Sequence, residues 1–189
     1  MKILIVSTSD INGGAARAAY RLHKALLIKK IDSKMIVQNK SSDDFTVLSQ
    51  KSKLQMGLNR LRAFLDKLLT KFYKGKTKTL FSPSLVPFSN IVDEINRISP
   101  DIVHLHWICG GMLSIKDLSK INSKIVWNCH DMWPFTGGCH YDEECNQYKN
   151  KCSACKVLNT NNNFLSQKVF NEKIKVYNRI KNLTIIGSS

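Results

Sequence analysis

Apolar positions along the chain form short runs that are separated by amphipathic stretches. Residues 2–7 read Lys-Ile-Leu-Ile-Val-Ser, a pattern that predicts a short buried strand. The Gly13-Gly14 pair then leads into an alanine- and leucine-rich stretch that predicts a helix. A second apolar run at 34–38 predicts another strand, so the opening of the chain has the pattern of a βαβ unit with a right-handed crossover.

The same alternation returns in the second half of the chain. Helices are expected after Ser89 and Ser114, which are suited to be N-caps, and over residues 166–181. Strands are expected at 101–107, at 124–129 and from residue 182. Strands that alternate with helices and are apolar on both faces are typical of parallel sheets. The predicted fold class is therefore α/β, with a Rossmann-like, doubly wound, mostly parallel sheet.

Size and composition are those of one globular domain. The chain has 189 residues, of which 43% are hydrophobic and 23% are charged. No apolar run approaches the roughly 20 residues that a membrane-spanning helix needs. The apolar stretch at the N-terminus is short and Asp10 follows it closely, which does not fit a signal peptide. We therefore expect a cytoplasmic protein.

The charge of the chain is strongly basic. A net charge of +15, from 29 basic and 14 acidic residues, favours a polyanionic partner. More than half of the excess lies in residues 51–80, which predict a basic amphipathic helix. Such a helix can lie on an anionic membrane surface, or it can pack its apolar stripe on the sheet. Nucleic acid is not the expected partner, because aromatic residues are not interleaved with the bases. The stripe consists of Leu54, Leu58, Leu61, Leu65, Leu68 and Phe72.

The glycine turn after the first strand is a candidate binding site. Gly13 and Gly14 would let the backbone approach a ligand closely, and the helix N-terminus with Arg17 beside it suits a diphosphate. The alternative is a tight turn beside a closely packed helix. The turn matches neither the dinucleotide fingerprint nor the phosphate loop of ATP-binding proteins, so we expect no nicotinamide or flavin cofactor.

Histidines at two later strand ends are the candidates for chemistry. His130 and Asp131 follow a predicted strand, where the carboxylate could orient the imidazole; the alternative is that the pair caps the loop. His104 and His106 share one face of the preceding strand, and His106 is nearer the carboxyl end, where ligands bind. Trp133 either anchors its loop in the core or forms an apolar wall against a sugar ring.

A cysteine-rich loop extends over residues 130–160. Its spacing is C-x5-C-x6-C-x2-C, and four thiolates can close a tetrahedral zinc site without an open position for catalysis. We expect structural zinc, with an iron–sulfur cluster, free thiols or disulfides as the alternatives. The predicted ligands are Cys139, Cys145, Cys152 and Cys155.

Three stretches of the chain together resemble a known family. They read MKILIVSTSDINGGAARAAYRLHKAL, DIVHLHWICGGMLSI and HDMWPFTGGCHY, the last with its trailing cysteines. The chain resembles the N-terminal half of bacterial family 4 glycosyltransferases that build surface polysaccharides. The resemblance implies a GT-B fold, in which two Rossmann-like domains face each other across a cleft. Residues 1–189 would be the N-terminal, acceptor-side domain.

The resemblance also implies an activity and roles for single residues. It implies transfer of a sugar from a nucleotide diphosphate sugar to a growing, lipid-linked glycan. Gly13, Gly14 and Arg17 would lie near the donor phosphates, and His130 would contact the donor sugar or the reacting centre. The basic helix would attach the enzyme to the inner face of the cell membrane.

The family places the nucleotide-sugar site in a C-terminal domain that is absent from these 189 residues. The chain alone is therefore expected to be inactive without a separate C-terminal half. The alternative function is a non-enzymatic, zinc-stabilised module that binds a membrane or a protein.

Overall fold

A six-stranded parallel sheet forms the centre of the protein, in the order β3-β2-β1-β4-β5-β6. The computed structural model describes residues 1–49, 52–87, 89–160 and 164–187. β1 pairs with both β2 and β4, so the strand order reverses beside β1. The predicted α/β, Rossmann-like class is confirmed, and the short strand β3 is an addition to it. The strands are β1 (Lys2–Ser9), β2 (Asp32–Asn39), β3 (Val47–Ser49), β4 (Ile102–Leu105), β5 (Lys124–Cys129) and β6 (Leu183–Gly187).

Helices connect these strands, largely where the sequence predicts them. Ser114 is the N-cap of α4 and forms a capping box with Asp117, as expected. Ser89 is not the N-cap of α3, because Asn90 takes that position. The Ser89 hydroxyl instead donates to the Met112 carbonyl at 2.7 Å. The helices are α1 (Gly14–Ile28), α2 (Lys53–Lys71), α3 (Ile91–Ile98), α4 (Ile115–Leu118) and α5 (Phe164–Tyr177), with short 3-10 turns at Trp133–Phe135 and Gln147–Lys149.

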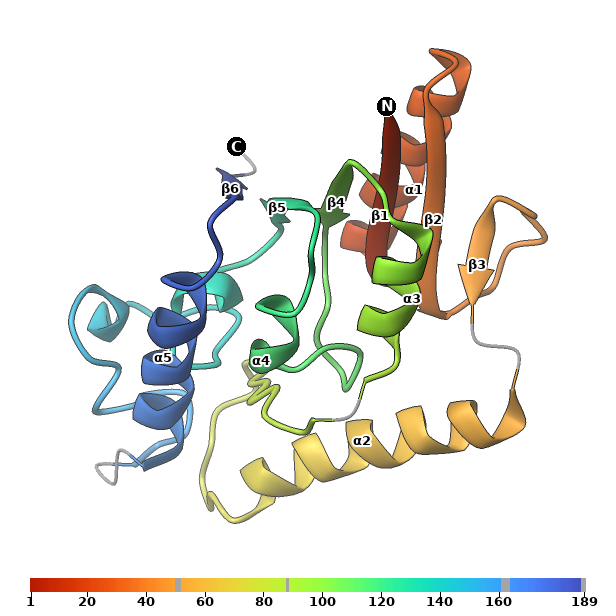
Figure 1. Cartoon of the computed structure of the whole chain (residues 1–189). Helices are drawn as coiled ribbons and strands as arrows, with labels where there is room; N and C mark the ends of the chain where they lie inside the picture. Colours follow the sequence, from red (N-terminus) through yellow and green to blue (C-terminus); the bar gives the residue numbers. More distant parts are fainter. Residues whose placement is uncertain (50–51, 88, 161–163, 188–189) are drawn as a thin grey trace.

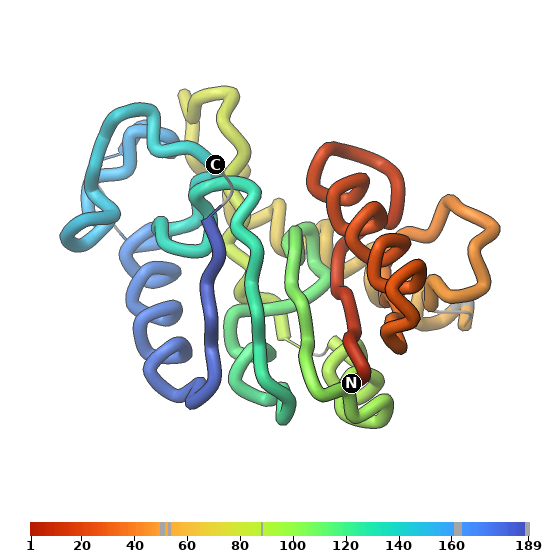
Figure 2. Tube along the Cα trace, turned by 90° about the horizontal axis from the view of Figure 1, so that it is seen from above, coloured from red at the N-terminus to blue at the C-terminus, as the bar shows by residue number. Residues whose placement is uncertain are grey.

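Both faces of the sheet are covered around β1, as a doubly wound fold requires. Successive side chains of a strand point to opposite faces. Ile3 and Ile5 belong to the apolar cluster that α1 covers, whereas Leu4 and Val6 belong to the cluster that α3, α4 and α5 cover. Figures 1 and 2 show α1 on one side of the sheet and α3 on the other.

The orientation of α2 is unusual, because its polar side faces inward. Arg62 donates hydrogen bonds to the carbonyls of Val86, Pro87 and Met112 at 3.0–3.1 Å. These contacts hold α2 against the loops before α3 and α4, below those two helices in Figure 1. The buried positions recur at helical spacing and are Asn59, Arg62, Asp66 and Thr70.

The leucine stripe of α2 therefore lies on the outside of the protein. Leu54 is 75% exposed, Leu61 is 51% exposed and Phe72, at the end of the helix, is 77% exposed. The alternative in which the stripe packs on the sheet is therefore not found in the structure. Residue 51, at the start of the predicted basic segment, lies outside the described residues. Among the helices that are described, none is long and apolar enough to cross a bilayer.

Candidate functional site

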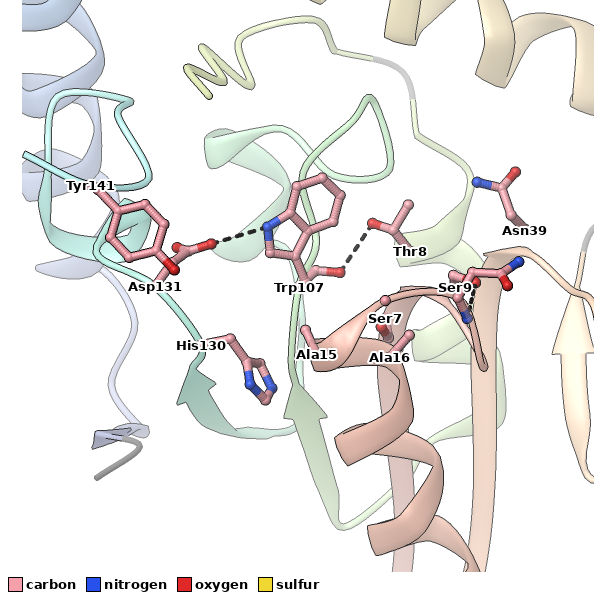
Figure 3. Close-up of a pocket in the computed structure, with 13 residues that line it drawn as sticks. Ser7, Thr8, Ser9, Ala15, Ala16, Asn39, Trp107, His130, Asp131 and Tyr141 are labelled. Carbon is pink, nitrogen blue, oxygen red and sulfur yellow. Dashed lines mark hydrogen bonds between the residues drawn. The ribbon is translucent and has the colours of Figure 1, made fainter. Parts of the chain in front are cut away.

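The carboxyl ends of β1, β4 and β5 meet around one open cavity of about 690 Å3. Its walls are the end of β1, the turn at Gly13 and Gly14, Trp107 after β4, and His130 and Asp131 after β5. Figure 3 shows His130 and Asp131 on one side of this space and the start of α1 on the other. We call it the strand-end cavity. The two predicted sites at Gly13-Gly14 and His130-Asp131 thus lie in a single pocket.

The glycine turn brings a helix N-terminus to this cavity. Gly13 has φ 101° and ψ 164°, a conformation that residues with a side chain rarely adopt, and it is the N-cap of α1. No side chain caps the helix there. The first N–H groups of α1 and the helix dipole therefore favour an anionic ligand group at this wall.

Asp10 fixes the loop that carries the turn. Its carboxylate is fully buried and accepts hydrogen bonds from the backbone N–H groups of Ile11, Ser41 and Ser42 at 2.8–3.1 Å. Burial alone would raise the pKa of Asp10, but the hydrogen bonds from Ser42 and Ser41 lower it below its usual value. Asp10 thus ties the end of β1 to the end of β2 and holds the turn in place.

His130 lines the cavity as a neutral imidazole. Its Nε2 lies 2.8 Å from Nδ1 of His106 and 3.2 Å from Nδ2 of Asn128. Burial lowers the pKa of His130 and lowers that of His106 to about 3. Near neutral pH both rings are therefore uncharged, and His130 can form a hydrogen bond with a ligand as a neutral group.

The hydrogen bonds of Asp131 go to residues other than His130, as in the alternative in which the pair caps the loop. Its Oδ2 accepts a hydrogen bond from Nε1 of Trp107 at 3.2 Å and lies 2.6 Å from Nδ1 of His140. Its Oδ1 accepts from the Trp133 backbone N–H at 2.9 Å. Burial would raise the pKa of Asp131, but these hydrogen bonds, that with His140 foremost, lower it. Asp131 therefore holds the loop after β5 in shape. The ring that His130 contacts is that of His106.

Three other predicted binding residues lie outside the cavity wall. His106 is only 4% exposed, and its ring is hydrogen-bonded to that of His130, which lines the cavity. Trp133 is buried against Trp127 and donates to the Ser82 carbonyl at 2.7 Å, so it anchors its loop in the core. Arg17 is exposed on the first turn of α1. A role of Arg17 toward phosphates stays a prediction.

Trp107 and Tyr141 line the cavity although the sequence did not single them out as ligand-binding residues. The predicted strand over 101–107 placed Trp107 on the face opposite His106. β4 ends at Leu105, so the strict alternation of faces stops two residues before Trp107. The sequence signal that could have pointed to Trp107 as a ligand-binding residue is its position directly after His104 and His106, at the end of a strand.

The four loop cysteines surround one small space of about 10 Å3 next to Gly137. All four are free, and the Gly137 N–H donates to Sγ of Cys152 at 3.1 Å. Across the described parts of the chain, no group of three or more His, Cys, Asp or Glu side chains is arranged to hold a metal ion. Structural zinc therefore stays a prediction from the spacing, which metal analysis of the purified protein would test. The cysteines are Cys139, Cys145, Cys152 and Cys155.

Comparison with known proteins identified a distant enzyme relative. The chain is 25% identical over 170 residues to the putative colanic acid biosynthesis glycosyl transferase WcaC of Escherichia coli strain K12. The match covers 84% of this chain and 40% of the relative, so the chain spans less than half of the relative's length. No family model and no solved structure matches the chain. The similarity supports a glycosyltransferase role and does not favour the non-enzymatic alternative.

Proposed function

We propose that the chain forms the N-terminal, acceptor-side domain of a GT-B glycosyltransferase of family 4, which transfers a sugar from a nucleotide diphosphate sugar to a growing, lipid-linked glycan. The observation that carries this proposal is the convergence of the glycine turn and His130 in the strand-end cavity. One wall of this cavity favours an anion and the facing wall offers a neutral imidazole. These two walls suit a nucleotide diphosphate sugar, which carries an anionic diphosphate next to an uncharged sugar.

In this proposal the domain acts by positioning and electrostatics. The N-terminus of α1 stabilises negative charge that develops on the departing diphosphate. His130 holds a sugar or acceptor oxygen, and Trp107 and Tyr141 bound the space in which the two substrates meet. A second Rossmann-like domain, facing this cavity, supplies the nucleotide-sugar site. The chain alone is then inactive.

The membrane is the second part of the proposal, and α2 supports it. The outward stripe of α2 lies beside a row of bases, and the only acid between residues 54 and 80, Asp66, is buried. An apolar stripe flanked by exposed lysines fits the surface of an anionic bilayer, where each base adds about 1 kcal/mol. The enzyme would then work on the inner face of the cell membrane, next to its lipid-linked acceptor. Among the residues whose side chains are described, the exposed bases are Arg60, Lys67 and Lys71 on α2, and Lys74, Lys76 and Lys78 in the segment that follows it.

Sugar transfer is the test of the activity. A panel of nucleotide sugars is offered to the chain with and without a co-expressed second domain, corresponding to the part of the relative outside the match, and transfer to lipid-linked acceptors is measured. We expect transfer only with both parts, and a loss of about 100-fold in kcat/KM for His130→Ala. Arg17→Ala should weaken transfer, whereas Arg21→Ala, one turn further along α1, should not. Absence of transfer from every donor would refute the activity.

Vesicle binding tests the membrane part separately. We expect the chain to sediment with vesicles that contain phosphatidylglycerol and not with pure phosphatidylcholine, and to dissociate as salt rises. Leu61→Asp should abolish this binding. Ile174→Asp, the same change at a residue of α5 that is 47% exposed, is the matched control and should leave it intact. A monomer–dimer equilibrium that Leu61→Asp removes, without vesicle binding, would assign the stripe to a second copy of the chain instead.

A further inference from the structure

The ring of His106 contacts the ring of His130, and the backbone of His106 is itself held by two hydrogen bonds. The His106 backbone N–H donates to the Val6 carbonyl at 2.9 Å, and its carbonyl accepts from Nε1 of Trp127 at 3.1 Å. Its ring also packs on that of His104, with 4.8 Å between the ring centroids. The 2.8 Å distance from Nδ1 of His106 to Nε2 of His130 requires that one of these nitrogens carries the shared hydrogen.

Two placements of the ring hydrogens fit this distance, and they differ in whether Nε2 of His106 carries a hydrogen. If His106 donates from Nδ1, its Nε2 is left as an acceptor and His130 carries its proton on Nδ1. If His130 donates from Nε2, His106 carries its own proton on Nε2. Nε2 of His106 is buried and has no hydrogen-bond partner among the described residues. The second placement thus leaves a buried N–H unpaired, which proteins tolerate less often than an unpaired acceptor.

Asn128 favours the first placement as well. In the orientation that the structure gives the Asn128 amide, Nδ2 lies 3.2 Å from Nε2 of His130, and an amide nitrogen can only donate. If Nε2 of His130 also carried a hydrogen, two N–H groups would point at each other. Both neighbours of Nε2 therefore donate to it, so that the proton of the neutral ring is on Nδ1.

We propose that His106 is a positioning residue that holds His130 in the tautomer protonated on Nδ1. Because His130 lines the strand-end cavity and its Nε2 is occupied by His106 and Asn128, the N–H on Nδ1 is the donor that the ring can offer to a ligand there. The ligand group that fits is an acceptor oxygen, such as a sugar hydroxyl or a phosphoryl oxygen. The use of this donor in sugar transfer rests on the proposed function, whereas the tautomer does not. Burial keeps both rings neutral, and only a neutral imidazole has a tautomer to select.

The tautomer is directly measurable by 15N NMR of the whole chain labelled at histidine, because protonated and unprotonated ring nitrogens have well-separated shifts. His130→Gln identifies the His130 signals by their loss. We expect protonated Nδ1 and unprotonated Nε2 at neutral pH. A wild-type His130 that is protonated on Nε2 would overturn the proposal. If instead the tautomer is as expected and no sugar is transferred, the proposed function fails and this inference stands.

Two conservative variants separate positioning from a merely structural role. The amide nitrogen of His106→Asn lies near the place of Nδ1, whereas that of His106→Gln lies near the place of Nε2. We expect His106→Asn to keep the wild-type tautomer. His106→Gln should lower the ratio of the Nδ1-protonated to the Nε2-protonated form of His130 about fivefold, which is the weight of one hydrogen bond. Equal ratios in both variants and the wild type would overturn the proposal.

Discussion

α2 and α3 are both amphipathic helices, yet they turn opposite sides to the protein. α3 buries Ile91, Val92 and Ile95 against the sheet and leaves Asp93 and Arg97 exposed. α2, which lies below α3 in Figure 1, buries polar residues and exposes its leucines. An apolar stripe in a sequence thus indicates a helix and one of its faces, but it does not say what covers that face.

The difference follows from the contacts available to each helix. α3 leads directly into β4 and lies over the apolar side chains of β1 and β4. α2 meets loops instead, and loops present carbonyl groups that need donors from outside regular secondary structure; three of them accept hydrogen bonds from Arg62. The polar side of α2 is therefore its structural side, and its apolar side is available for a partner. The following substitutions test this division, in order of expected effect.

Arg62→Ala should have the largest effect on stability. Arg62 is 5% exposed, bonds three backbone carbonyls, and lies 3.8 Å from the buried carboxylate of Asp117. Its removal takes a donor from the carbonyls of Val86 and Pro87 and the guanidinium from beside Asp117, which keeps its hydrogen bonds to Ser114 and Lys120. The loss of this buried charge and its hydrogen bonds costs about 3–5 kcal/mol. Urea unfolding followed by circular dichroism measures it. Arg62→Lys should recover only part of the loss, since one ammonium group cannot reach all three carbonyls. A loss below that of an ordinary surface substitution would show that α2 is not held by its polar side.

Ile95→Ala should come next, as the corresponding change on the apolar side of α3. Ile95 is fully buried in the main core cluster. Deletion of a buried isoleucine side chain costs about 2–5 kcal/mol, and here we expect about 3. The urea midpoint measures it on the same scale as the Arg62 variants. If Ile95→Ala were tolerated without loss, the contrast between the two helices would disappear.

Gly111→Ala should have an intermediate effect, because it presses directly on α2. Gly111 has φ 79°, and a Cβ there would lie 2.6 Å from the backbone nitrogen of Ala63. Overpacking of this kind costs about 1–3 kcal/mol. Gly110→Ala is the matched control: its φ is also positive, but its Cβ would meet only the Trp107 ring, at 3.6 Å. Both variants place alanine at a positive φ, so the difference between their thermal midpoints measures the clash with α2. Equal midpoints would mean that α2 does not pack closely against Gly111.

The sheet and the location of the site could be predicted from the sequence, because each depends on short local patterns. Apolar runs of strand length and the glycine turn indicate β1, α1, β2, β4 and β5. Carboxyl ends of parallel strands lie at one edge of a sheet, so the glycine turn and His130 had to be on the same side. β3 has only three residues, too few for a periodic pattern.

The partners of the site residues could not be predicted, because they depend on how the loop after β5 folds back. Asp131 is adjacent to His130 in the chain, but the loop returns nine residues later and places His140 against it. The indole of Trp133 likewise meets a distant segment, at the Ser82 carbonyl. The orientation of α2 was equally hidden, since its polar contacts are carbonyls of distant loops and those carry no residue-specific pattern.

Leu61→Ala should have the smallest effect on stability, and this makes it the most discriminating variant. Leu61 is 51% exposed, and alanine is at least as good a helix former, so the free energy of unfolding should change by no more than about 0.5 kcal/mol. The same urea unfolding measures it beside Ile95→Ala, which removes a comparable side chain from the opposite environment. A loss equal to that of Ile95→Ala would mean that the stripe of α2 is covered within the protein. If stability is kept while vesicle binding falls, the stripe of α2 contacts a partner outside the chain, and its leucines contribute to that contact and not to the stability of the fold.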